Sequence, residues 1–203
     1  MKQFAKALCV AGLLFAAPVM APVMAEGAAD PAAATVRNFY DALTASMKAG
    51  GSAKGRYEKL KSAVEQDFDL PGMTALSVGP TWSSISAADQ KALTDAFERF
   101  TVANYARNFD SYNGQNFNVE PLVAERGSDK FVKSNMKSGG DTVAFNYRLH
   151  QAGNGWKIVD VFLAGNISTL AQKRADFAAT LASTGPQGLA KKIDALADQQ
   201  LSG

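Results

Sequence analysis

The sequence contains few of the residues that build catalytic and metal sites. It has one histidine, His150, and one cysteine, Cys9, which lies in a segment that we expect to be cleaved. A cysteine nucleophile and a site with several Cys or His ligands are therefore excluded. His150 falls on the polar face of a predicted strand beside a turn, where a hydrogen-bonded surface role explains it better than a catalytic triad does. Gly139-Gly140 lacks the spacing and the following helix of a phosphate-binding loop. We expect no enzyme, no cofactor and no metal.

Long hydrophobic runs are also missing, with one short exception near the N-terminus. Residues 7–17, ALCVAGLLFAA, follow two lysines and are too few to span a bilayer. Two small-x-Ala patterns then end at Ala21 and Ala25. This layout predicts a secretory signal peptide over residues 1–25, followed by one domain over residues 26–203.

Removing the predicted signal peptide leaves no excess of either charge. The whole chain has 21 Lys and Arg against 19 Asp and Glu, and residues 1–25 contain two lysines and no acidic residue. The expected mature protein therefore carries a formal net charge of zero. It has no long-range field to attract nucleic acid, so we expect no nucleic-acid partner. Without cysteine, its fold is held together by packing alone.

The periodicity of apolar residues predicts a single α+β domain with helices before and after a four-stranded antiparallel sheet. Helical spacing indicates helices at 31–49, 55–67, 87–109, 167–182 and 186–200, with a short helix and a turn inside 68–85. Strands separated by short turns are indicated at 115–125, 129–137, 141–150 and 155–164. Consecutive strands with short turns form a meander, and no linker divides the chain.

The last predicted strand, GWKIVDVFLAG, is apolar on both faces apart from Lys157 and Asp160. One face is expected to pack against helices as ordinary core. The other face either completes a solid core or lines a cavity with helix 87–109, and the pattern leaves both open. The register is also open, because a shift by one residue exchanges the two faces. Trp156, Ile158 and Phe162 form the cavity wall in one register, and Val159, Val161 and Leu163 in the other.

Asp160 is the acidic residue in the middle of this apolar strand. A buried carboxylate needs a partner or a raised pKa, and we expect an ion pair with Arg148 or Arg174. Asp67 and Asp69 also lie close together, but at a predicted helix end, where capping and solvation explain them. An isomerase acting on an apolar substrate with Asp160 as base remains an alternative function.

Three stretches together resemble the MlaC/toluene-tolerance family of exported bacterial lipid carriers. They are LSVGPTWSSISAADQKALTDAFERFTVANYARNF (76–109), VAFNYRLHQAGNGWKIVDVFLAGNISTLAQKRADFAATL (143–181) and GPQGLAKKIDAL (185–196). The order and spacing of the motifs carry the resemblance, which covers nearly all of the expected mature chain. Within the family, the sequence is most similar to the HpnM branch, which is associated with hopanoid biosynthesis. An inserted residue in Gly165–Leu170, where the family has Gly-Val-Ser-Leu, fits that branch.

The resemblance implies a monomeric periplasmic carrier that shields a phospholipid or a hopanoid between the inner and outer membranes. It implies a curved sheet that encloses an apolar cavity, and exchange of lipid with a membrane-bound transport complex. Such a role would serve outer-membrane maintenance and toluene tolerance. The alternative is a non-catalytic assembly subunit of a hopanoid or lipid export complex. The residues expected to line the cavity are Trp82, Phe97, Phe100, Tyr105, Val143, Phe145, Tyr147, Leu149, Trp156, Ile158, Phe162 and Leu170.

The signal peptide gives the first testable prediction. Expression of the full chain in a bacterium should yield a periplasmic product cleaved after Ala25, or with lower preference after Ala21. N-terminal sequencing and the intact mass of the purified protein measure the cleavage site. A product that stays in the membrane pellet after high-salt washing and still begins at Met1 or Lys2 would contradict it.

Overall fold

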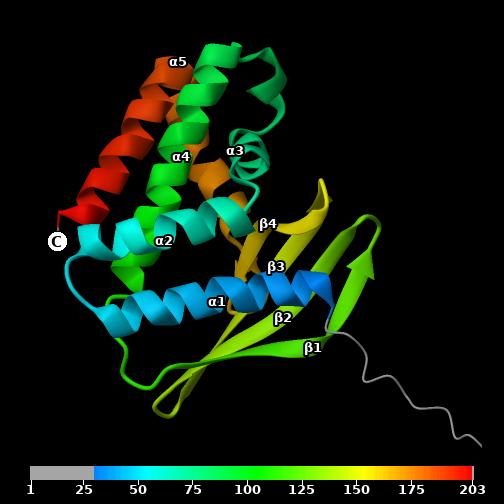
Figure 1. Cartoon of the computed structure of the whole chain (residues 1–203). Helices are drawn as coiled ribbons and strands as arrows, with labels where there is room; N and C mark the ends of the chain where they lie inside the picture. The colour runs from blue at the N-terminus through cyan, green and yellow to red at the C-terminus, as the bar shows by residue number, and fades with distance from the viewer. Residues whose placement is uncertain (1–29, 203) are drawn as a thin grey trace, which may run out of the picture.

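The computed structural model describes residues 30–202, which form a group of helices beside a twisted antiparallel sheet (Figure 1). The predicted signal peptide lies outside these residues. Within them, no helix is both long enough and apolar enough to cross a membrane. The elements in chain order are α1 (Pro31–Ala49), α2 (Ala53–Asp67), α3 (Leu70–Val78), the 3-10 helix η1 (Pro80–Ser84), α4 (Ala87–Asn108), β1 (Asn116–Arg126), β2 (Asp129–Ser138), β3 (Asp141–Ala152), β4 (Gly155–Leu163), β5 (Ile167–Ser168) and α5 (Thr169–Leu201).

The helices begin where the sequence supplies a capping side chain. Asp30 accepts a hydrogen bond from the backbone N–H of Ala32 at 2.8 Å, and Pro31 occupies the first turn of α1. Gly50, at φ 61°, ends the same helix. Ser86 caps α4 by accepting from the N–H of Asp89 at 3.1 Å. The predicted helices therefore form close to the expected positions.

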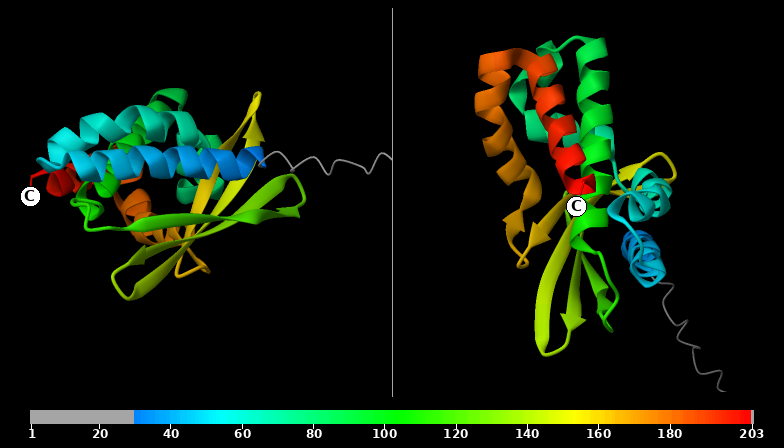
Figure 2. Two further views of the ribbon diagram at one scale, coloured as in Figure 1. Left: turned by 60° about the horizontal axis from the view of Figure 1, so that its bottom comes forward. Right: turned by 90° about the vertical axis from the view of Figure 1, so that its left-hand side faces the viewer.

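α5 consists of two helical segments that meet at Gly185. This residue has a φ of 68°, which favours glycine, and Pro186 follows it. Figure 2 shows the first segment, in orange, and the second, in red, running in opposite directions beside α4. Lys192 Nζ donates to Thr180 Oγ1 at 2.8 Å across the two segments. The two helices predicted at 167–182 and 186–200 correspond to these segments.

The sheet has five strands in the order β1-β2-β3-β4-β5, with every neighbouring pair antiparallel. The expectation of four strands is therefore wrong by one short strand. Ile167 and Ser168 pair with Leu163 and Phe162 after a tight turn. Two residues are too few to produce an alternating pattern, and the sequence prediction placed them at the start of the next helix.

β4 contains a bulge that exchanges its two faces. Ile158 pairs with Leu149, and Asp160 pairs with Arg148, so Val159 has no partner in β3. Before the bulge, even-numbered residues such as Ile158 face the helices, whereas odd-numbered residues such as Val161 do so after it. Neither of the two registers left open by the sequence therefore holds along the whole strand. This is why GWKIVDVFLAG has apolar residues at both even- and odd-numbered positions, although Ile158 and Val161 face the same side of the sheet.

Asp160 lies on the opposite face of β4 and is covered by the start of α5. Its carboxylate accepts hydrogen bonds from the Ser168 hydroxyl at 2.6 Å and from the backbone N–H groups of Val161 at 2.8 Å and Leu170 at 3.3 Å. The expected ion pair with Arg148 or Arg174 is wrong. Arg148 lies 3.8 Å from Asp129, and Arg174 donates to the carbonyl of Leu76 at 3.1 Å. Asp160 is only 4% exposed, and hydrogen bonds rather than a cation compensate its burial.

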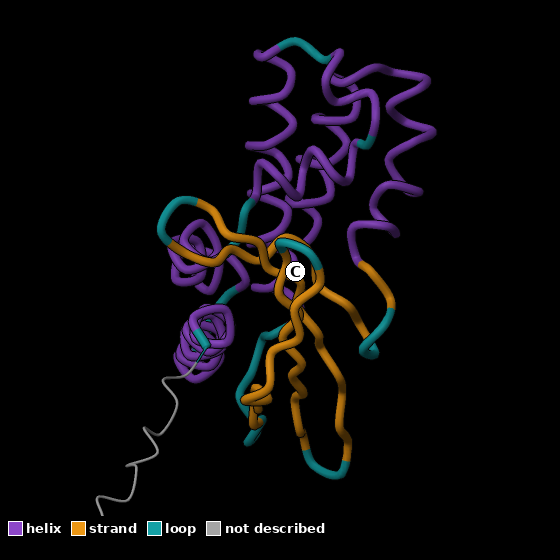
Figure 3. The backbone as a smooth tube through the Cα atoms, turned by 90° about the vertical axis from the view of Figure 1, so that its right-hand side faces the viewer, coloured by secondary structure: helices purple, strands orange, loops and turns teal. Residues whose placement is uncertain are grey.

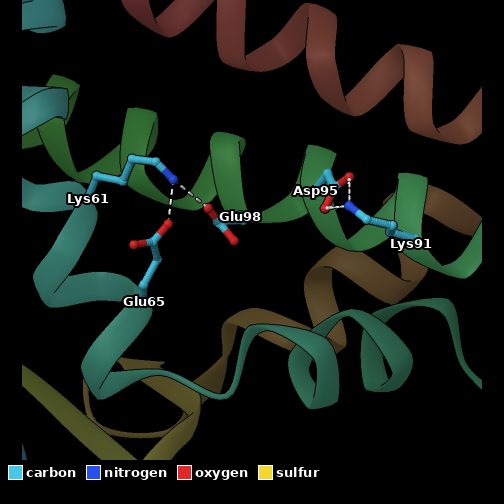
Figure 4. A network of polar contacts seen from close by, with 5 residues as sticks. All are labelled: Lys61, Glu65, Lys91, Asp95 and Glu98. Carbon is cyan, nitrogen blue, oxygen red and sulfur yellow. Dashed lines mark hydrogen bonds and ion pairs between the residues drawn. The ribbon is translucent and has the colours of Figure 1, made fainter.

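The helices pack on one face of the sheet and on one another. α1 crosses the strands and contacts β1, β2 and β4, while α4 and α5 stand beside the sheet (Figures 1 and 3). Lys61 of α2 donates to Glu98 of α4 at 2.9 Å and also to Glu65, and Lys91 pairs with Asp95 within α4 (Figure 4). These ion pairs are partly or largely exposed and contribute at most about 1 kcal/mol each, so the apolar core holds the helices in place.

The hydrogen bonds of Asp160 lead to the second prediction. Asp160→Ala should lower the free energy of unfolding by about 1–3 kcal/mol, because the buried backbone N–H groups of Val161 in β4 and Leu170 in α5 lose their acceptor. Asp141→Ala, at the exposed first residue of β3, is the matched control and should change the free energy of unfolding by less than about 0.5 kcal/mol. Urea denaturation measures both. Equal stability of the two variants would refute this role for Asp160.

Candidate functional site

A pocket of about 540 Å³ lies between the sheet and the helices. α1 contributes Tyr40 and Leu43, and β3 contributes Phe145 and Tyr147. β4 contributes Val161 and Leu163, the two odd-numbered residues after its bulge. α4 and the start of α5 provide the opposite wall. The remaining apolar lining residues are Phe68, Met73, Phe97, Phe100, Tyr105, Phe109 and Met136.

Aromatic rings in contact with one another form much of this wall. Tyr105 meets Phe109 with ring centroids 6.0 Å apart, and Phe109 meets Phe145 at 6.4 Å. Tyr40 lies edge-on to Tyr147 at 5.7 Å. Offset and edge-to-face pairs of this kind are favourable and restrict ring movement. The wall is therefore apolar and built from side chains that hold one another in position.

The tyrosine hydroxyls in the wall carry no charge at neutral pH. Burial raises the pKa of Tyr40, Tyr105 and Tyr147 above the ordinary value for a phenol. Tyr40 shares a hydrogen bond of 2.6 Å with the hydroxyl of Ser134, which itself donates to the carbonyl of Phe145. The tyrosine hydroxyls in the inner part of the pocket are therefore uncharged, and that of Tyr40 has a hydrogen-bond partner.

The part of the wall made by α4 and α5 is polar. Thr101, Asn104 and Asn108 line it from α4, and Thr169, Gln172, Lys173 and Asp176 line it from α5. Burial lowers the pKa of Lys173, although the nearby charge of Asp176 opposes this shift. The pocket therefore combines an apolar interior with one polar side, which suits a ligand that has both characters.

Over residues 34–195, the sequence matches the family described as MlaC protein. The chain belongs to the MlaC family. A solved structure of a phospholipid-binding protein from Ralstonia solanacearum, in complex with a phospholipid, has the same fold. It is similar at a TM-score of 0.73 and 24% sequence identity, covering 83% of this chain and 98% of that one. No curated protein sequence matches this MlaC-family chain.

The structure brings five of the twelve predicted cavity residues together around the pocket. They are Phe97, Phe100, Tyr105, Phe145 and Tyr147. Three of these follow helical spacing along α4, and two alternate along β3. The helical period of 3.6 residues and the strand period of 2 residues therefore indicated one face of α4 and one face of β3, and these two faces meet in the fold.

The other seven predicted residues do not line this pocket. Leu149, Ile158 and Leu170 are buried in the packed core, and Val143 is exposed at the far end of β3. Trp82 lies half-buried in η1. The bulge places Phe162 on the opposite face, against Phe131. Trp156 precedes the bulge and lies near Lys130, whose ammonium is 4.7 Å from the indole centroid.

Several lining residues were missed because they lie on elements that the sequence presents as ordinary core or surface. Tyr40 and Leu43 belong to the apolar face of helix 31–49, and Phe68 follows α2 directly. Asn104 and Lys173 lie on helices whose polar positions usually face solvent. Helical periodicity shows that a residue faces inward, but it does not show whether other side chains fill the space in front of that residue.

The remaining candidates for acid-base chemistry lie away from the pocket lining. His150 Nε2 lies 3.0 Å from Asp69, which also caps α3 by accepting from the N–H of Gly72 at 3.1 Å. Asp67 is buried at the end of α2, and its burial raises its pKa to about 6. Among residues 30–202, no group of three or more Cys, His, Asp and Glu residues is arranged to hold a metal ion.

The β4 bulge gives the third prediction, which compares two positions of one strand. Ile158 is fully buried in packed core, so Ile158→Trp should lower the free energy of unfolding by about 1–3 kcal/mol. Val161 borders the pocket, so the larger ring of Val161→Trp should enter that space, cost less stability and reduce binding of an apolar fluorescent probe. Denaturation and probe titration measure the two effects. Equal destabilisation with unchanged probe binding would rule out an open space beside Val161.

Proposed function

We propose that this protein is a periplasmic carrier that holds the apolar part of a lipid in its pocket between the inner and outer membranes. The proposal rests chiefly on the pocket, which has an uncharged aromatic interior and a polar side formed by α4 and α5. Membership of the MlaC family supports it. So does the shared fold of the Ralstonia solanacearum protein, which is described as phospholipid-binding.

Burial of a lipid tail supplies enough free energy for binding without specific polar contacts. Each CH₂ group removed from water contributes about 0.8 kcal/mol. The volume of about 540 Å³ falls within the range of ordinary ligand pockets, roughly 300–1,000 Å³. Transfer of a lipid requires no bond to be made or broken, and we therefore propose a carrier and not an enzyme.

Transport of a lipid between the two membranes determines where the carrier acts and which partner it contacts. A signal peptide over residues 1–25 would deliver the chain to the periplasm, where it acts as a monomer and exchanges lipid with a membrane-bound transport complex. The cargo is a phospholipid or, as the resemblance to the HpnM branch implies, a hopanoid. Such traffic would contribute to outer-membrane maintenance and to toluene tolerance.

The fourth prediction tests this function directly. Protein purified from the periplasm without detergent should carry lipid, detected by native mass spectrometry and by organic extraction. Val161→Trp should retain less lipid than Asp141→Ala, since only the first substitution fills the pocket. A folded wild-type protein that carries no lipid, and takes up none from vesicles, would refute the proposal.

A further inference from the structure

The face of the sheet that points away from the pocket, here called the outer face, is largely free of helices. α1 crosses in front of the strands in Figure 1 and contacts β1, β2 and β4 on the inner face. Among residues 30–202, no helix other than α1 packs extensively against β1, β2 or β3. On the outer face, the start of α5 covers β4 around Asp160. The outer face of β1, β2 and β3 is therefore open to a partner.

The register determines which side chains point to the outer face. Ser134 of β2 contacts Tyr40 of α1, so Lys133 and the other odd-numbered residues of β2 point outward. Their partners in the neighbouring strands share that face. The described cations of the outer face are Arg126, Lys133, Lys137, Arg148 and Lys157, and its described acids are Asp129 and Asp160.

Both acids of the outer face already have partners. Asp160 is 4% exposed and accepts hydrogen bonds from the start of α5. Asp129 lies 3.8 Å from Arg148. Lys157 turns to the edge of the sheet and donates to the backbone carbonyl of Gln66. The other three cations are therefore left without an acid on this face.

These three cations, Arg126, Lys133 and Lys137, form a basic row along β1 and β2. All three are exposed, and within residues 30–202 no carboxylate lies within 4.0 Å of their charged nitrogens. Lys133 and Lys137 are four residues apart on one strand, and Arg126 pairs with Asp129, four residues before Lys133. The basic row is therefore roughly 27 Å long. Phe131 lies within it, with its ring centroid 4.9 Å from the guanidinium of Arg126.

We propose that the basic row docks the carrier on a membrane surface that contains anionic lipid headgroups. This inference rests on the proposed carrier function and adds a contact that is separate from the pocket. Negative headgroups complement the basic row, and each Lys or Arg near such a surface strengthens binding about fivefold (about 1 kcal/mol). Because the expected mature chain has a formal net charge of zero, the attraction comes from the local distribution of charge. It acts within about one Debye length of the surface.

The composition of the outer face favours a lipid surface over a protein partner. Lysine is depleted in protein–protein interfaces, which are built around buried aromatic and apolar anchors. Two of the three cations here are lysines, and the half-buried rings of Phe131 and Phe162 contact each other at 6.2 Å. An ammonium on a flexible stem can adjust to headgroups that move sideways in a bilayer.

Sedimentation with vesicles of defined charge tests the basic row. Delipidated mature protein is mixed with dense vesicles of phosphatidylcholine alone, or of phosphatidylcholine and phosphatidylglycerol in equal amounts, and the protein in the pellet is quantified. The variant is Lys133→Gln/Lys137→Gln. Lys54→Gln/Lys59→Gln removes two exposed lysines from α2 and is the matched control. Val161→Trp is a second control, because it changes the pocket and leaves the outer face unaltered.

At low ionic strength, wild type and both controls should bind the anionic vesicles at least about tenfold more than the neutral ones, and high salt should remove the difference. Lys133→Gln/Lys137→Gln should bind the anionic vesicles about twentyfold more weakly, because two cations are lost. It should still fold, as circular dichroism and thermal melting measure, and still carry lipid when purified from the periplasm.

Two results would overturn the docking inference and leave the carrier function standing. One is equal binding of wild type to both vesicles, or unchanged binding of Lys133→Gln/Lys137→Gln. The other is retention of wild type by immobilised polyglutamate but by neither vesicle, which would assign the outer face to an acidic protein. Wild type that docks through these lysines but neither carries nor takes up lipid would confirm the docking surface and refute the carrier function.

Discussion

The unpaired Val159 in β4 is the constraint on which the arrangement of the pocket depends. Without this bulge, one set of alternate residues would face the helices along the entire strand. With it, Ile158 contributes to the solid core and Val161 contributes to the pocket, although both face the same side of the sheet. One strand therefore serves two packing environments, and apolar residues are needed at even-numbered positions before the bulge and at odd-numbered positions after it.

Hydrogen bonds fix the two halves of β4 in different ways. The backbone N–H of Asp69 donates to the carbonyl of Ile158 at 2.9 Å, so the connection between α2 and α3 protects the first half. β5 pairs with the second half. Asp160 then connects the sheet to α5 through Ser168 and Leu170. Lys173 follows three residues after Leu170, so it lies about one helical turn beyond this connection. A strand edge left open would invite pairing with another chain, and here both halves are covered.

Local signals in the sequence predicted most of the fold. Asp30, Pro31 and Gly50 mark the ends of α1, and short turns separate β1, β2, β3 and β4. β5 and the bulge could not be predicted in the same way. A two-residue strand has no period, and an unpaired residue is defined by the partner strand and not by its own identity. The apolar pattern of GWKIVDVFLAG showed that two registers were possible, but it did not show that a bulge combines them.

The site was predictable only where a single element determines which residues face inward. Phe97, Phe100 and Tyr105 share a face of α4, and Phe145 and Tyr147 share a face of β3, so their periods predict that they face inward, and all five lie around the pocket. Lys173 has no such signal, because a lysine on a helix normally extends into water with its stem along the surface. Its position depends on how α5 lies against Phe100, which is a tertiary contact. The apolar interior is thus encoded by periodicity, whereas the position of Lys173, the one cation among the described lining residues, is encoded by the packing of one helix against another.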